Sequence, residues 1–138
     1  MQIQKGMAIK FGAEEDIENA ISDTGVGKAV IFGSQAGTVK IGTDPKRFAG
    51  VIISCEAGAR SVKAGEAVGV LNDGIIEVKV NGAVSYGSYI TLDEDGAFKA
   101  ATISATPTAA EVLSICGVAM GTTTSSGGVI PALIYIRK

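Results

Sequence analysis

The sequence contains no histidine and no tryptophan among its 138 residues. A chain without histidine lacks the imidazole of catalytic triads, of many metal sites and of proton shuttles. Aromatic residues make up 5% and charged residues 19% of the chain, and the formal net charge is -2. This balance provides no basic surface for nucleic acid and no charge excess typical of disorder. The composition therefore disfavours most familiar enzymes and a nucleic-acid partner.

Long apolar runs are also missing, because Gly, Ser and Thr interrupt every stretch of the roughly 20 residues that a membrane-spanning helix needs. The first six residues contain no apolar core of a secretion signal. Cys55 and Cys116 lie too far apart for the paired spacing of a zinc ribbon or redox motif, and both stand in apolar runs. We therefore expect buried thiols in a soluble protein that is synthesised in a cytoplasm and has no membrane partner.

Glycine is abundant, at 19 of 138 residues, and it accompanies many Val, Ile, Thr and Ala residues. Turn residues recur about every 8 to 12 positions, the spacing of a sandwich or barrel. The Asp73-Gly74 pair predicts a hairpin turn after Asn72. Residues 76–80 alternate between apolar and charged side chains, as a half-buried strand does. These patterns predict an all-β protein.

The N-terminal segment is the exception to this strand-like pattern. Residues 1–12 alternate loosely and predict either a first strand or an extended arm. Glu14, Glu15 and Asp16 favour the positive end of a helix dipole, and they precede Ile17, Ala20 and Ile21 at helical spacing. We expect one short helix there, ending near residues 22–25.

No motif predicts a catalytic, metal or cofactor site. Residues 25–28 read Gly-Val-Gly-Lys, but a phosphate-binding loop would require Gly where Ser22 stands and Ser or Thr where Ala29 stands. Residues 93–95 are acidic, yet they lack the alternating ligands of a calcium loop, so a hairpin tip with Gly96 explains them. The two cysteines have no imidazole to activate them.

The last third of the chain is almost uncharged. Between Ala100 and Ile136 the one ionisable carboxylate or amine is Glu111. Because charged residues are depleted at the centres of protein interfaces, this segment is suited to subunit contacts. The competing interpretation is that the same residues form the core of the monomer.

Short motifs then follow one another in a fixed order over residues 50–138. They occupy residues 62–70, 76–84, 87–90, 95–96, 115–120 and 129–136. This order resembles that of the capsid cement, or head decoration, proteins of tailed bacteriophages, in which a K-x-G-[DE]-x-V-G string precedes an alternating strand, an acidic turn, a G-V-A strand and a β-branched final strand. Two features depart from the family pattern: residues 1–49 are longer, and Pro131 interrupts the final strand, which predicts an edge position or a bulge there.

The resemblance implies a structural virion protein on the outside of an icosahedral head. Such a protein ties neighbouring major capsid protein subunits together, commonly as a trimer at three-fold or quasi-three-fold positions. We therefore expect an all-β fold, a small single-domain β-sandwich or barrel of β-tulip or jelly-roll type with one short N-terminal helix. Residues 1–12 would form an arm or first strand, and residues 13–138 a single β-rich decoration domain. We expect no enzymatic activity and no cofactor.

Two sets of residues are candidate contact sites. Ile3, Met7 and Ile9 are candidates for capsid binding as an added strand, or else belong to a hydrophobic first core strand. Val129, Ile130, Leu133 and Tyr135 are candidates for the interface between copies. The alternative function is a ligand-binding β-sandwich, a carbohydrate or host-attachment module, in which Tyr86, Tyr89 and Tyr135 would stack on the ligand.

Overall fold

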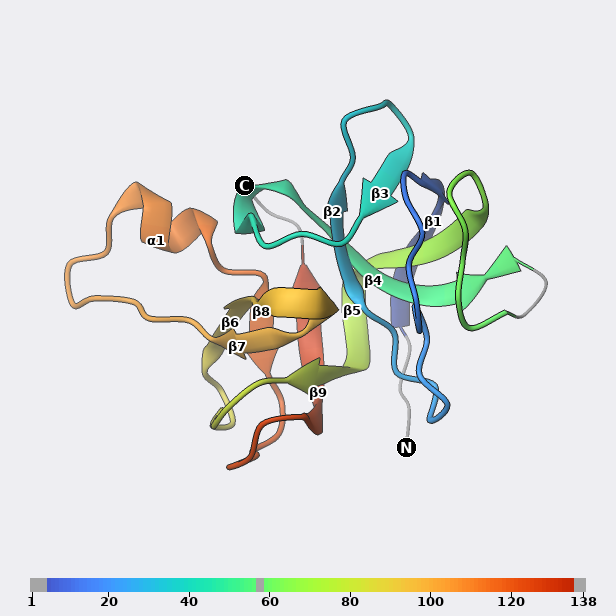
Figure 1. Cartoon of the computed structure of the whole chain (residues 1–138). Helices are drawn as coiled ribbons and strands as arrows, with labels where there is room; N and C mark the ends of the chain where they lie inside the picture. The colour runs from blue at the N-terminus through green and yellow to red at the C-terminus, as the bar shows by residue number, and fades with distance from the viewer. Residues whose placement is uncertain (1–4, 57–58, 136–138) are drawn as a thin grey trace.

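A computed structural model describes residues 5–56 and 59–135 of the chain (Figure 1). Strands dominate it, and α1 is the only α-helix among the described residues. The elements in chain order are β1 (Lys5–Ala13), β2 (Ala29–Phe32), β3 (Thr38–Lys40), η1 (Pro45–Arg47), β4 (Phe48–Cys55), β5 (Ala67–Val80), β6 (Tyr89–Leu92), η3 (Glu94–Gly96), β7 (Phe98–Ala100), α1 (Ala109–Leu113), β8 (Gly117–Ala119) and β9 (Gly128–Tyr135). The predicted β-rich character of this small domain is confirmed.

The nine strands form one sheet that closes on itself twice, and both closures share β5. The first ring has the order β1-β3-β2-β4-β5 and is closed by antiparallel pairing of β1 with β5. The second has the order β5-β7-β6-β8-β9 and is closed by pairing of β5 with β9, while β5 and β7 meet at one residue pair. We call these rings barrel 1, on the right in Figure 1, and barrel 2, on the left. The architecture is thus a pair of small barrels.

The 14-residue strand β5 is long enough to serve both barrels. Its first half pairs with β1 and β4, and its second half pairs with β9. The hairpin predicted at residues 72–74 is therefore wrong. Gly74 pairs with Gly6 of β1 on one side and Ile134 of β9 on the other, so two partner strands keep the Asp-Gly pair within β5, with a bulge at Asn72 and a φ of 148° at Gly74 in place of a turn.

Each barrel has its own hydrophobic core, and the strands between them bury both faces. Val30 and Ile52 point into the barrel 1 core, while the neighbouring Ile31 and Val51 belong to the barrel 2 cluster. Phe48 of β4 packs edge-on against Phe98 of β7, with ring centroids 5.8 Å apart. Lys28 also donates to Asp95 at 2.8 Å across the junction. The two barrels are therefore packed together as one unit.

The helix predicted over residues 14–22 is wrong, although the burial of its apolar residues is as expected. Ile17 and Ala20 are buried in the barrel 1 core, but Ile17 forms a β-bridge with Val62 and Asn19 has a left-handed φ of 51°. The Ile17 amide donates to the Val62 carbonyl, and the Val62 amide donates back. Pairing with a distant segment thus replaces the local helix.

The one α-helix of the described residues, α1, lies in the C-terminal third of the chain and not in the predicted N-terminal segment. Thr108 is its N-cap and Glu111 its third residue, and the two side chains form a reciprocal capping box. The Thr-x-x-Glu spacing was visible in the sequence. The helix has five residues, none of them buried.

Pro131 lies in a strand paired on both sides, so neither the predicted edge position nor a bulge at Pro131 is seen. Pro131 pairs with Glu77 of β5, and its carbonyl accepts from the Met120 amide. Its nitrogen therefore also points toward Met120, one residue beyond the end of β8 at Ala119. Pro131 has no N–H, but at this position the ladder between β8 and β9 has already ended. The proline therefore removes no ladder hydrogen bond, which explains why β9 tolerates it.

Gly50 tests how closely β4 approaches its neighbouring strand β5. Its φ is 140°, and an added Cβ would collide with the Leu71 carbonyl oxygen and the Val70 side chain of β5. We expect Gly50→Ala to lower the free energy of unfolding by about 3 kcal/mol, since strain and overpacking add. Gly37→Ala is the matched control, because Gly37 also has a positive φ but meets nothing within 4 Å; it should cost about 1 kcal/mol. Equal losses in urea unfolding would contradict the close approach.

Candidate interaction surface

In residues 5–56 and 59–135 no three His, Cys, Asp or Glu side chains group closely enough to hold a metal ion, and no helix is long and apolar enough to cross a membrane. Cys55 and Cys116 are free thiols. Burial, with a smaller contribution from the charge of Glu66, raises the pKa of the Cys55 thiol, which therefore stays protonated near neutral pH. The exposed surfaces are the better candidates.

A row of apolar side chains crosses the outside of barrel 2. Ile75 of β5 lies opposite Leu133 of β9, which lies opposite Val118 of β8, which lies opposite Tyr89 of β6. Because directly paired residues project to the same side of a sheet, these four side chains form one continuous stripe. We call it the outer row. Their chain neighbours Ile76, Ile134, Ala119 and Ile90 fill the barrel 2 core, so the row must face outward.

Exposed apolar residues gather around the outer row. Of the eight large hydrophobic side chains that are exposed among the described residues, Tyr89 and Leu133 lie in the row, Val129 lies on β9, and Met120 directly follows β8. Scattered apolar residues are normal on a surface, but a contiguous stripe marks a contact site. Charged residues flank the row on β5, at Glu77 and Lys79.

The residues predicted as an interface between copies fall on both sides of β9. Val129 is 44% and Leu133 37% exposed, and Tyr135 is half-buried. Ile130 is 2% exposed and belongs to the barrel 2 core, so it has no surface to offer a partner. Among the tyrosines proposed to stack on a ligand, Tyr89 is in the outer row and Tyr86 is exposed in the loop before β6.

The segment predicted as a capsid-binding strand forms β1 and closes barrel 1. Ile3 lies outside the described residues, and of Met7 only the backbone is described. Ile9 pairs with Val70 of β5 and is 40% exposed. β1 is therefore a strand of barrel 1 on which Ile9 stays open to solvent, and capsid binding by these residues stays a prediction.

The second edge of β1 is unpaired along most of its length. Within the described chain, β1 meets β3 only through Gly12 and Ala13, whereas β5 pairs with residues 5–12. The Gly12 amide donates away from β5, to the Gly37 carbonyl. Since backbone groups alternate along a strand, Ala8 and Lys10 also direct their N–H and C=O groups away from β5. This edge is a template for an added strand.

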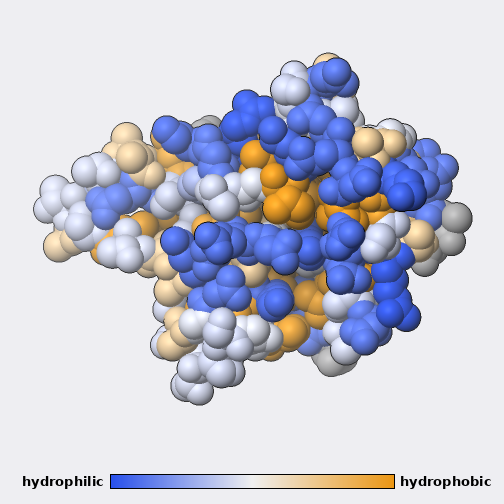
Figure 2. Space-filling view, viewed as in Figure 1, coloured by the Kyte–Doolittle hydropathy of each residue, from blue (hydrophilic) through white to orange (hydrophobic). Residues whose placement is uncertain are grey.

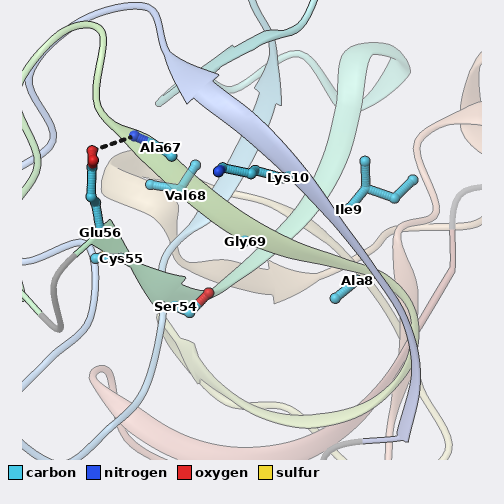
Figure 3. A pocket seen from close by; sticks show the side chains of 9 residues that line it. All are labelled: Ala8, Ile9, Lys10, Ser54, Cys55, Glu56, Ala67, Val68 and Gly69. Carbon is cyan, nitrogen blue, oxygen red and sulfur yellow. Dashed lines mark hydrogen bonds between the residues drawn. The ribbon is translucent and has the colours of Figure 1, made fainter.

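A shallow groove of about 330 Å³ lies on the other side of β1, where this strand is paired with β5 (Figure 3). It crosses β1, β5 and β4, and it is lined by Ala8, Ile9, Lys10, Ser54, Cys55, Glu56, Ala67, Val68 and Gly69. Figure 3 shows Glu56 hydrogen-bonded to the Ala67 amide at one end and Ala8 and Ile9 at the other. The groove therefore places mixed apolar and charged groups on the paired side of β1, across this strand from the free edge.

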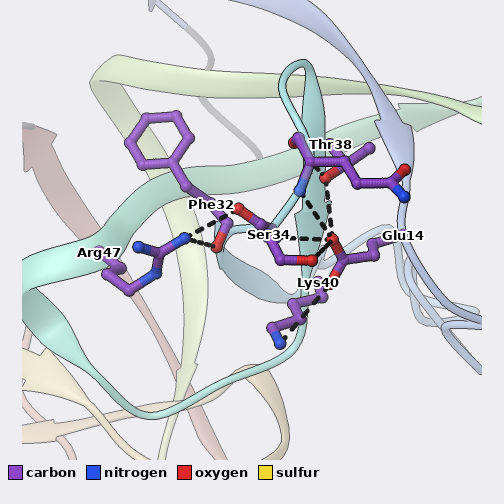
Figure 4. Close-up of polar contacts among 8 residues, drawn as sticks. Glu14, Phe32, Ser34, Thr38, Lys40 and Arg47 are labelled. Atoms are coloured by element: carbon purple, nitrogen blue, oxygen red, sulfur yellow. Dashed lines mark hydrogen bonds and ion pairs between the residues drawn. The ribbon is translucent and has the colours of Figure 1, made fainter.

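Glu14 anchors the end of β1 to the β2–β3 loop (Figure 4). One carboxylate oxygen, Oε1, accepts from the Ser34 amide at 2.6 Å, the Ser34 hydroxyl at 2.7 Å and the Gln35 amide at 3.1 Å, and Lys40 lies 3.6 Å from Oε2. The Ser34 hydroxyl is the largest of these influences, and together they lower the pKa of Glu14 from 4.5 to about 2. Arg47 secures the same loop by donating to the carbonyls of Phe32 and Gly33.

Residues 101–116 form a loop that projects from barrel 2 and carries α1. Figure 1 shows α1 clear of both barrels, and Figure 2 shows this projection as mostly pale residues of intermediate hydropathy. Val112 is 53% exposed. The Glu111 carboxylate accepts hydrogen bonds from the amides and hydroxyls of both Ser104 and Thr108. These bonds, the Thr108 amide foremost, lower the pKa of Glu111.

A comparison with models of protein families shows to which family the chain belongs. The model of a family described as XM1 gp53 minor capsid protein matches residues 4–132. The chain belongs to this family of phage minor capsid proteins. The predicted association with a phage capsid is thereby confirmed.

The fold of this minor capsid protein has a counterpart among solved structures. The chain is similar to the structure described as the head fiber gp8.5 N base in bacteriophage phi29, with a TM-score of 0.53 over 93% of this chain and 92% of that one. Sequence identity is 10%, so the likeness concerns the fold alone. No curated protein matches the sequence.

The sequence predicts the strand β9 and, as one of two alternatives, the strand β1. It does not predict that the four residues of the outer row lie side by side. Ile75, Val118 and Tyr89 come from three segments that are far apart in the chain, and only strand register brings them beside Leu133. The single available signal was the shortage of charge in the last third. The α1 loop had a clearer signal in its capping-box spacing.

The lowered pKa of Glu14 predicts how stability depends on pH. Because the folded-state pKa lies below the ordinary value, the ionised group stabilises the fold above about pH 4.5, and this contribution is lost as the pH falls toward about 2. Glu14→Gln should therefore lower the melting temperature near neutral pH, and the deficit should shrink at about pH 3. The exposed neighbour provides the control Glu15→Gln, which should change little at either pH. A deficit that stays constant with pH would refute the role of the charge.

Proposed function

We propose that this minor capsid protein is a structural, non-enzymatic component of the virion that binds the outer surface of the head. It stabilises contacts between major capsid protein subunits and self-associates as a trimer. The free edge of β1, in a chain of a minor capsid family, is the observation that carries this proposal. The likeness in fold to the base of a phage head fiber supports the outer location.

Capsid binding would use the added-strand mode at β1. Ala8 and Lys10 present backbone donors and acceptors to a capsid strand, while the exposed Ile9 side chain contacts its side chains. Glu14 and Arg47 support this surface by tying the loop beside β1 to the barrel. The edge is thus preorganised, which reduces the entropy lost on binding.

Stabilisation follows from mass action. A protein that binds the assembled lattice and not dissociated subunits stabilises the lattice by RT ln(1 + [L]/Kd), about 2.7 kcal/mol per site at a hundred times Kd. Self-association through the exposed Val129 and Leu133 and the half-buried Tyr135 of β9 adds avidity, because the second and third contacts form at high effective concentration. Modest individual contacts are then sufficient.

Cosedimentation with undecorated heads of the cognate phage tests this function. We expect saturable binding by the wild-type chain and at least tenfold weaker binding by Lys10→Pro, because proline removes a donor from the free edge without removing one from the β5 ladder. Lys10→Ala, which keeps the backbone donor, is the matched control and should bind nearly as well as wild type. Circular dichroism should show the same fold in all three.

Two results would contradict the proposal. The absence of saturable binding by the wild-type chain would exclude a capsid-binding role. Equal losses in Lys10→Pro and Lys10→Ala would place the contact in the lysine side chain and not in strand pairing.

A further inference from the structure

The α1 loop has the features of a segment that lacks its packing partner. None of the residues of α1 is buried, and a five-residue helix is too short to be stable without tertiary packing. The loop also carries Ile103, Val112 and Leu113, of which Val112 is the most exposed. Nevertheless the loop is ordered by internal hydrogen bonds, so its shape is fixed before any partner arrives.

The one charged side chain of the α1 loop forms its hydrogen bonds within the loop. Glu111 is the one acidic or basic residue in residues 101–116, and its carboxylate accepts hydrogen bonds from Ser104 and Thr108. The surface that the loop presents to a partner is therefore uncharged. A partner matched to it in charge must also offer an uncharged, apolar surface.

The outer row is such a surface, and it is continuous with the loop. The Ala101 amide donates to the Tyr89 carbonyl, and the Tyr135 amide donates to the Cys116 carbonyl, so both ends of the loop are anchored beside the row. None of the four residues of the row has a carboxylate, amine or guanidinium group. In Figure 1, α1 stands clear of both barrels and is open to a second copy.

We infer that the α1 loop of one copy packs on the outer row of the next copy, and that three such contacts close a ring. This inference rests on the self-association proposed above and specifies its contact. Packing of the α1 loop on the outer row is a heterologous contact, because two different surface patches meet. Such contacts generate a closed ring when the rotation from one copy to the next returns to the first copy. Pairing of two rows would instead be isologous, would give a dimer, and would leave both loops uncovered.

Complementation between two variants of the full-length chain tests the inference. Val112→Asp places a charge in the α1 loop and leaves the outer row unchanged. Leu133→Asp places a charge in the outer row and leaves the α1 loop unchanged. Both side chains are exposed, so folding should be retained, as circular dichroism and thermal unfolding will verify. Thr43→Asp adds the same charge at an exposed position before η1 and serves as the control.

Sedimentation velocity gives distinct results for each arrangement. We expect wild type and Thr43→Asp to be trimeric, and each single variant to be monomeric with a dissociation constant raised at least about tenfold, because an unpaired carboxylate is costly in an apolar contact. An equimolar mixture of Val112→Asp and Leu133→Asp should form dimers, since one intact loop still meets one intact row. The mixture should not form trimers.

Several outcomes would overturn the inference. They are a Val112→Asp protein that remains trimeric, a mixture that remains monomeric, and a wild-type chain that is monomeric or dimeric at the highest concentration measured. Loss of head binding by Val112→Asp with an unchanged oligomeric state would instead assign the loop to the capsid. Binding of wild-type protein to heads is measured separately, so failure of the ring and failure of capsid binding are distinguishable.

Discussion

The structure depends on one strand that closes two barrels. β5 contributes Val68 and Val70 to one core and Ile76, Val78 and Val80 to the other. Neither barrel can close without it, because β1 and β9 both complete their rings on this strand. A strand that pairs along both edges must stay extended, which explains why the Asp-Gly pair in its middle does not turn.

This shared strand also fixes where the contact surfaces lie. It positions β1 so that one edge is bonded and the other is free, and it sets the register that brings Ile75 beside Leu133. β5 thus pairs both with the strand that has the free edge and with a strand of the outer row. Binding to a capsid and to a second copy would then require no rearrangement of the fold, which suits the proposed role in linking preformed subunits.

Sequence alone predicted the β-rich class, the final strand and the tip around Gly96, because these features depend on local composition and turn chemistry. It failed where distant partners override local preference. Ile17 and Ala20 have helical spacing, yet Val62 draws this segment into a bridge. The outer row could not be predicted from spacing, since its members come from four strands and only the register aligns them. Ile130 was expected at an interface, but alternation along β9 places it in the core.

The most direct measurement is a reconstruction of the native virion by electron cryomicroscopy at a resolution that separates strands. The account predicts the two-barrel unit on the outer face of the head, with the free edge of β1 against a capsid strand and each α1 against the neighbouring copy around a three-fold or quasi-three-fold axis. A virion without this density on its outer face, or with isolated copies attached through another surface, would contradict it.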